Sequence, residues 1–120
     1  MEICFEGIGQ VVATFRTKDK TLTAGMAVTL TGNGKVGLGE EESDKPLCGV
    51  TVGAVRNGAV AVQIGGVVKV GYAGKETFNV GYVTLTCDGD GGVKTADGTD
   101  GARCLVLAVD KEEKTIAVKL

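Results

Sequence analysis

The chain has 120 residues and a formal net charge of −2, with no cluster of basic residues, which excludes the electrostatic footprint of a nucleic-acid-binding protein. Histidine and tryptophan are absent and aromatic residues are few, so the commonest general base is missing and platforms for stacking bases or sugars are not expected. No apolar run is long enough to span a bilayer, so no membrane partner is expected, and the length fits one domain, residues 1–120.

The N-terminal part of the chain predicts strands. The segment MEICFEGIGQ starts acidic and lacks the apolar region of a signal peptide, which predicts synthesis in a cytoplasm. The runs EICFE (2–6) and QVVATFR (10–16) are predicted to form the first two strands. The 20 glycines are spread between valine-rich runs, a pattern typical of many short strands joined by tight turns.

The stretch GNGKVG at 32–37 matches the glycine fingerprint of a dinucleotide-binding loop. That fingerprint works only between a strand and a helix, because the helix N-terminus holds the pyrophosphate. The residues after Gly37 show no helical spacing of apolar side chains and include Pro46. The stretch is therefore interpreted as a turn, and no nucleotide cofactor is expected.

An internal duplication relates residues 24–64 to residues 80–120. The tetrapeptide VTLT occurs at 28–31 and again at 83–86, and Cys48 corresponds to Cys104 at an offset that then holds without a gap to the end of each repeat. GNGKVG then corresponds to CDGDGGVK, which indicates one kind of turn used twice. Asn-Gly and Asp-Gly predict a type I′ hairpin turn, whose two central residues both need positive φ.

Each repeat predicts the same order of elements: strand, glycine-rich turn, short strand, polar loop, long strand, hairpin, strand. The second hairpins are expected at 56–58 and 110–114, and the segment GGVVKVGYAGKETFN between the repeats predicts another strand and a turn. The last strands alternate, so their apolar residues should share a buried face: Val60, Val62 and Ile64 in the first repeat, and Ile116, Val118 and Leu120 in the second. With no helix expected and about ten to twelve short strands, the fold class is all-β, a small β-barrel or barrel-like sandwich with an internal duplication.

Two acidic stretches are candidate sites. Asp88-Gly89-Asp90-Gly91-Gly92 resembles the start of a calcium loop, but glycine and threonine stand where ligands are needed at its fifth and twelfth positions. Solvated turn residues are the preferred interpretation, and weak calcium binding helped by Asp97 and Asp100 is left open. The run of Glu40, Glu41, Glu42 and Asp44 is interpreted as a solvated loop.

Neither Lys69 nor the cysteines match the sequence context of a known modification, redox or metal site. Lys69 resembles the modified lysine of biotin or lipoyl carrier domains, but it sits inside an apolar run and not at a hairpin tip. The four cysteines, Cys4, Cys48, Cys87 and Cys104, form no C-x-x-C pair and are expected to be buried small hydrophobes, although their spacing leaves a disulfide open. We therefore predict no catalytic, cofactor-binding or metal-ligating residue, and a structural or binding role instead of an enzyme.

The duplicated unit resembles the small phage head proteins known as capsid decoration or capsid cement proteins. The resemblance is carried by residues 83–120 and by VAVQIGGVVKVGYAG at 60–74. It implies a β-barrel-like module on the outer surface of the virion, associated as a trimer that bridges major capsid subunits. Such proteins stabilise the expanded icosahedral shell.

The docking residues are less defined, because the long N-terminal arm of some members of that family is not visible here. Ile3, Cys4 and Phe5 are the predicted capsid contact, since apolar residues at a chain end are easily tethered. The same residues could instead form an edge strand of the barrel. The alternative function is a generic β-barrel binding module of a phage tail, a baseplate or an accessory domain.

Overall fold

A computed structural model describes residues 9–38, 46–73, 78–95 and 101–120, which contain ten strands and no helix. The strands are β1 (Val11–Arg16), β2 (Ala27–Gly32), β3 (Lys35–Gly37), β4 (Gly49–Thr51), β5 (Ala59–Gly65), β6 (Val67–Gly71), β7 (Gly81–Cys87), β8 (Val93–Thr95), β9 (Ala102–Asp110) and β10 (Thr115–Lys119). The predicted all-β class is confirmed.

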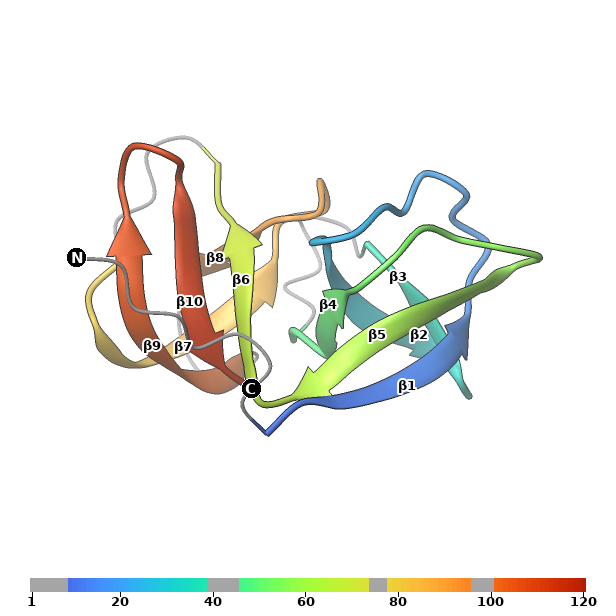
Figure 1. Cartoon of the computed structure of the whole chain (residues 1–120), viewed down its shortest axis with the longest axis horizontal. Coiled ribbons are helices and arrows are strands. Elements are labelled where there is room, and N and C mark those ends of the chain that lie inside the picture. The colour runs from blue at the N-terminus through green and yellow to red at the C-terminus, as the bar shows by residue number, and fades with distance from the viewer. Residues whose placement is uncertain (1–8, 39–45, 74–77, 96–100) are drawn as a thin grey trace.

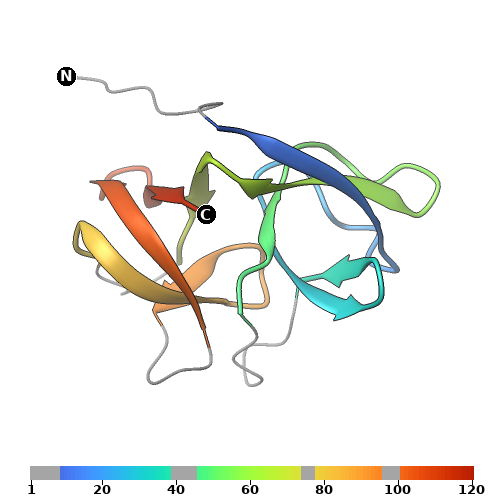
Figure 2. The same cartoon turned by 90° about the horizontal axis from the view of Figure 1, so that it is seen from below.

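The strands form two bodies that lie side by side (Figures 1 and 2). Strands β1 to β5 close into a barrel in the order β1-β3-β2-β4-β5, because β1 pairs with both β5 and β3. Strands β6 to β10 form a second five-stranded sheet in the order β6-β10-β9-β7-β8. We call residues 11–65 the first unit and residues 67–119 the second unit.

The topology repeats along the chain. Because the barrel is closed, its strand order can be started at β3, which gives β3-β2-β4-β5-β1. Adding five to each strand number gives β8-β7-β9-β10-β6, which is the order of the second sheet starting from β8. The repeat therefore also includes β1 and β6, which lie outside the predicted limits of 24–64 and 80–120. Their sequences agree with this, since Val11 and Val67 are separated by the same spacing as Cys48 and Cys104.

The two units differ in two ways: within the described residues only the first closes into a barrel, and β9 of the second is longer than the equivalent β4 of the first. In the first unit, the parallel pair of Arg16 with Lys35 closes the barrel. In the described part of the second unit no ladder joins β6 to β8, although a Cβ on Gly92 would lie only 2.9 Å from the carbonyl oxygen of Gly71. The predicted long strand occurs only in the second repeat, because β9 has nine residues whereas β4 has three and is followed by Gly53.

Two hydrophobic cores hold the units together. The barrel interior is filled by Leu22, Val28, Val36, Val60 and Val62. The second core contains side chains from β6 to β10 and also Ala27, Leu47 and Val50 from the first unit. The first unit therefore supplies one wall of the second core. The predicted core positions Val60, Val62, Ile116 and Val118 are confirmed as buried, and Leu120 is half-buried against the second core.

The prediction that Ile64 shares the buried face of β5 is wrong. Gln63 and Gly65 are the partners of consecutive residues on β1, Val12 and Val11, so Ile64 is an extra residue in a β-bulge. A bulge interrupts the alternation of a strand and turns the following side chains. Ile64 is exposed as a result, and the neighbouring Gln63 is buried.

The hairpin at 56–58 is confirmed. Arg56 and Ala59 exchange two backbone hydrogen bonds of 2.8 and 2.9 Å, and the central residues Asn57 and Gly58 have φ values of 51° and 73°, as a type I′ turn requires.

The type I′ prediction is wrong for the glycine-rich turn that occurs in both repeats. Between β2 and β3 only Gly34 has positive φ, and between β7 and β8 only Gly89 and Gly91 do, whereas Asn33, Asp88 and Asp90 do not. A register shift between Leu30 and Gly32 supplies the twist in the first repeat, so a single left-handed glycine is sufficient there.

Candidate functional site

The GNGKVG stretch lies within the β2–β3 hairpin and not at the start of a helix. Gly37, the last glycine of the fingerprint, is a strand residue paired with Thr29 of β2. Its backbone therefore belongs to a ladder, and the arrangement of free N–H groups that holds a pyrophosphate at a helix N-terminus is not formed. The interpretation as a turn is confirmed.

Asp88 stabilises its own turn. Its Oδ1 atom accepts hydrogen bonds from the backbone N–H groups of Asp90 (2.8 Å) and Gly92 (3.0 Å). Among the residues that the structure describes, no group of three acidic or cysteine side chains could hold a metal ion. Asp97, Asp100 and the acidic run at 40–44 lie outside the described residues.

Lys69 takes the solvent face of a strand, as predicted. It is exposed between buried Val68 and Val70, and it pairs with Ala117 in the middle of the β6–β10 ladder. The side chain therefore does not project from a hairpin tip, which is where a carrier lysine must lie.

The three described cysteines are free thiols that behave as apolar side chains. Cys87 and Cys104 are buried, and half-buried Cys48 packs against the barrel core. Burial raises the pKa of Cys48 and Cys104, and it raises the pKa of Cys87 to about 12, with smaller contributions from Asp88 and Cys48. These thiols stay protonated at neutral pH, so they are poor nucleophiles.

The predicted capsid contact, Ile3, Cys4 and Phe5, lies outside the described residues, as does the strand predicted at 2–6. Candidate binding surfaces must be found within the two described units.

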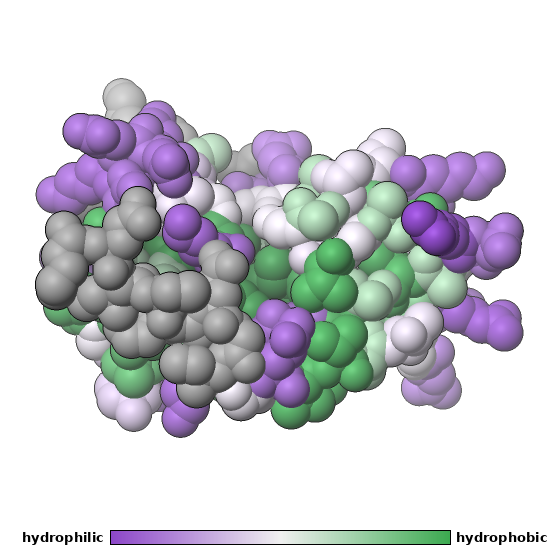
Figure 3. All heavy atoms as spheres, in the orientation of Figure 1, coloured by the Kyte–Doolittle hydropathy of each residue, from purple (hydrophilic) through white to green (hydrophobic). Residues whose placement is uncertain are grey.

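A group of exposed apolar side chains lies on or next to three neighbouring strands of the barrel, β4, β5 and β1. It consists of Val11, Val12, Val52 and Ile64, which are between 37% and 52% exposed. Val11 and Val12 are paired with the two residues that flank Ile64, and Val52 donates its backbone N–H to Ala61 of the same strand, β5. Figure 3 shows apolar surface over β1 and β5. We call these four residues the barrel strip.

A groove of about 440 Å³ lies at the junction of the two units, beside the barrel strip. Its apolar walls include Val50 from the barrel and Val67 and Val68 from the second unit. The buried Gln63 spans the junction by donating hydrogen bonds to the carbonyl oxygens of Gly65 (2.9 Å) and Val67 (3.3 Å). The groove is therefore formed by a junction that backbone and side-chain contacts hold in place.

A second apolar surface lies on the second unit. Val80 and Tyr82 are 67% and 66% exposed, and the Arg103 guanidinium lies 5.4 Å from the centre of the Tyr82 ring. That distance is within the range of a cation–π contact. Tyrosine and arginine are also the residue types that most often anchor protein interfaces.

The sequence patterns did not predict the barrel strip or the exposed surface at Val80 and Tyr82. Strict alternation placed Ile64 in the core, and Val52 follows a strand that is shorter than the repeat predicts. The one available signal was Gly65-Gly66, since glycine in or beside a strand often accompanies a bulge. A Cβ on Gly65 would lie 3.2 Å from the Cβ of Val11, which shows how closely the two strands approach there.

Comparison with protein-family models and with curated proteins gives no match for this chain. In the described residues, no helix is long and apolar enough to cross a membrane. A functional proposal therefore rests on the barrel strip and on the surface at Val80 and Tyr82. Both expose apolar side chains, as protein-binding surfaces do.

Proposed function

We propose that the protein is a structural phage head protein, which binds the outside of an expanded icosahedral capsid as a trimer and bridges major capsid subunits. The observation that carries the proposal is the exposed barrel strip on a duplicated β framework. Contiguous exposed apolar side chains are typical of protein–protein contact sites.

The architecture suits a stabilising role. Pairing between β1 and β5 holds Val11, Val12 and Ile64 in place, so little conformational freedom is lost when these residues bind, and a preformed surface retains more of its contact energy. Three subunits of one trimer would each contribute a modest contact, and linkage of several weak contacts raises the overall affinity without any new chemistry. The all-β barrel is also the fold that the resemblance to decoration proteins implies.

Co-sedimentation with undecorated heads tests the proposal. We expect the protein to bind expanded heads, to ignore unexpanded procapsids and to raise the temperature at which expanded heads disrupt. Val12→Glu, in the barrel strip, should weaken binding at least tenfold, because it places a charge in an apolar contact. Ala108→Glu is the matched control, since Ala108 is an exposed strand residue of the second unit. Removal of residues 1–6 tests the proposed contact by Ile3, Cys4 and Phe5.

Two results would contradict the proposal. A stable monomer that ignores both forms of the head would leave a generic binding module of a tail, baseplate or accessory domain as the better function. Equal loss of binding in Val12→Glu and Ala108→Glu would remove the barrel strip from the contact.

A further inference from the structure

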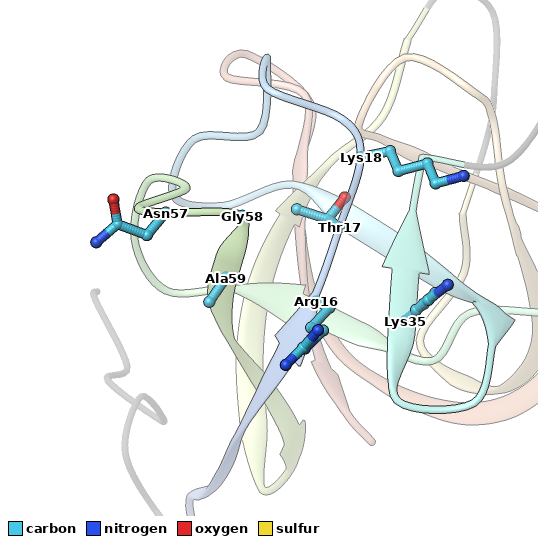
Figure 4. A pocket seen from close by; sticks show the side chains of 7 residues that line it. All are labelled: Arg16, Thr17, Lys18, Lys35, Asn57, Gly58 and Ala59. Atoms are coloured by element: carbon cyan, nitrogen blue, oxygen red, sulfur yellow. The ribbon is translucent and has the colours of Figure 1, made fainter.

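A pocket of about 450 Å³ lies at the end of the barrel where β1 ends and where β3 and β5 begin. Its lining residues are Arg16, Thr17, Lys18, Lys35, Asn57, Gly58 and Ala59 (Figure 4). Three of these seven residues are cationic and none is acidic. In Figure 4, the side chains of Lys18 and Lys35 extend toward the same side of the pocket.

The backbone around this pocket is fixed by hydrogen bonds. The N–H of Arg16 donates to the carbonyl oxygen of Gly34 (2.8 Å), and the N–H of Thr17 donates to that of Gly58 (3.0 Å). The Asn57-Gly58 turn on the opposite wall is itself closed by two hydrogen bonds. The three chain segments are thus held together before any ligand arrives, which lowers the entropic cost of binding.

The lining of the pocket contains positive charge and no acidic side chain. Arg16 and Lys35 are direct partners across the β1–β3 pair, so two cationic residues stand on adjacent strands, and their side chains extend in different directions in Figure 4. In the part of the chain that the structure describes, neither these residues nor Lys18 form an ion pair. Asp19 follows Lys18 directly, and its Oδ1 atom accepts hydrogen bonds from the backbone N–H (3.0 Å) and the hydroxyl (2.6 Å) of Thr21.

We propose that this pocket binds a carboxylate-rich peptide segment. The planar guanidinium of Arg16 matches a carboxylate with two parallel hydrogen bonds, and the two lysines add point charges that a second and third carboxylate can reach. A nucleic acid fits less well, because none of the lining residues is aromatic and the chain as a whole carries a net charge of −2. The inference does not depend on the proposed head function.

Fluorescence anisotropy with a labelled tetraglutamate peptide tests the pocket. We expect saturable binding at low salt that weakens about fivefold or more between 20 and 200 mM NaCl, since exposed charges are screened over about 10 Å at 0.1 M. Lys35→Glu should weaken binding at least tenfold, and Arg16→Gln should weaken it less. Lys119→Glu is the matched control, because it makes the same charge change at an exposed lysine of β10 and should bind like the parent protein. Thermal melts should show that all variants remain folded.

Several outcomes would overturn the inference. These are no saturable binding, equal binding of a tetraglutamine peptide, or equal losses in Lys35→Glu and Lys119→Glu. Tighter binding of inorganic phosphate or of a short single-stranded DNA than of tetraglutamate would assign the pocket to phosphates instead. Sedimentation of Lys35→Glu with heads separates the two proposals: retained head binding with lost peptide binding supports the pocket and shows that it is not the head contact.

Discussion

The strand face on which a side chain lies decides whether that side chain is buried or exposed. Val62 has no exposed surface and lies in the barrel core, and its counterpart in the second repeat, Val118, has none and lies in the second core. Lys119 follows Val118 directly and is exposed. The two valines are therefore equivalent positions of the repeat, each buried in a different core.

At this scale, we expect Val62→Asp and Val118→Asp each to destabilise the protein by about 4 kcal/mol or more, or to unfold it, because each buries an unpaired carboxylate. Lys119→Asp should change the free energy of unfolding by less than about 1 kcal/mol. Urea denaturation followed by circular dichroism measures all three. A Val62→Asp protein as stable as its parent would show that the strand register is wrong.

The connection between β5 and β6 is the element that joins the two units. Only Gly66 separates the two strands, and its φ is 84°. The carbonyl oxygen of Gly66 accepts a hydrogen bond from the N–H of Leu120 (2.9 Å), and these two features set the path of the chain there. Gln63 reinforces this corner with its two hydrogen bonds to backbone carbonyls. Its partner across the β4–β5 pair is Val50, which belongs to the second core. The corner therefore couples the barrel to the second core.

Gln63→Met tests that coupling at the element scale. Methionine has a similar size but cannot donate a hydrogen bond, so the carbonyl of Val67 loses a partner and we expect a loss of about 1–3 kcal/mol in stability. Gln10→Met is the control, because Gln10 is exposed and its contact with Gln63 is long, at 3.4 Å. Chemical denaturation of both variants gives the comparison. Equal stability of Gln63→Met and the parent would show that the Gln63 hydrogen bonds add nothing.

On the scale of the whole molecule, the two units are related by sequence and topology but are not energetically independent. The barrel encloses its own core, whereas the second core needs Ala27, Leu47 and Val50 from the first unit. Further bonds cross the junction, since the N–H of Ala27 donates to the carbonyl oxygen of Gly91 (2.8 Å) and Pro46 forms a bridge with Thr86. The loss of either unit would expose apolar surface of the other.

We therefore predict one cooperative unfolding transition for the whole chain. The only two tyrosines, Tyr72 and Tyr82, lie in or next to strands of the second unit, so tyrosine fluorescence reports on that unit alone. Far-UV circular dichroism reports on the strands of both. The two probes should give the same midpoint in urea, as two-state unfolding requires. Midpoints that differ reproducibly would show that the units unfold separately.

The sequence by itself determined the features that depend on neighbours along the chain. Alternation in 59–62 and 115–119 identified the buried faces, and Arg56-Asn57-Gly58 identified a hairpin. The constant spacing between matched residues, such as Cys48 and Cys104, identified the repeat. Such signals are readable because strand alternation and turn geometry are set by local sterics and hydration.

Only the tertiary structure decided the features that depend on pairing between distant segments. The bulge that exposes Ile64 exists because β1 pairs out of step with β5, and Val50 is buried because the second unit covers the outside of the barrel. Arg16, Lys35 and Asn57 meet in one pocket because closure of the barrel brings together the ends of three strands. Register and closure are set by the summed pairing and packing of whole strands, which no local pattern of residues contains.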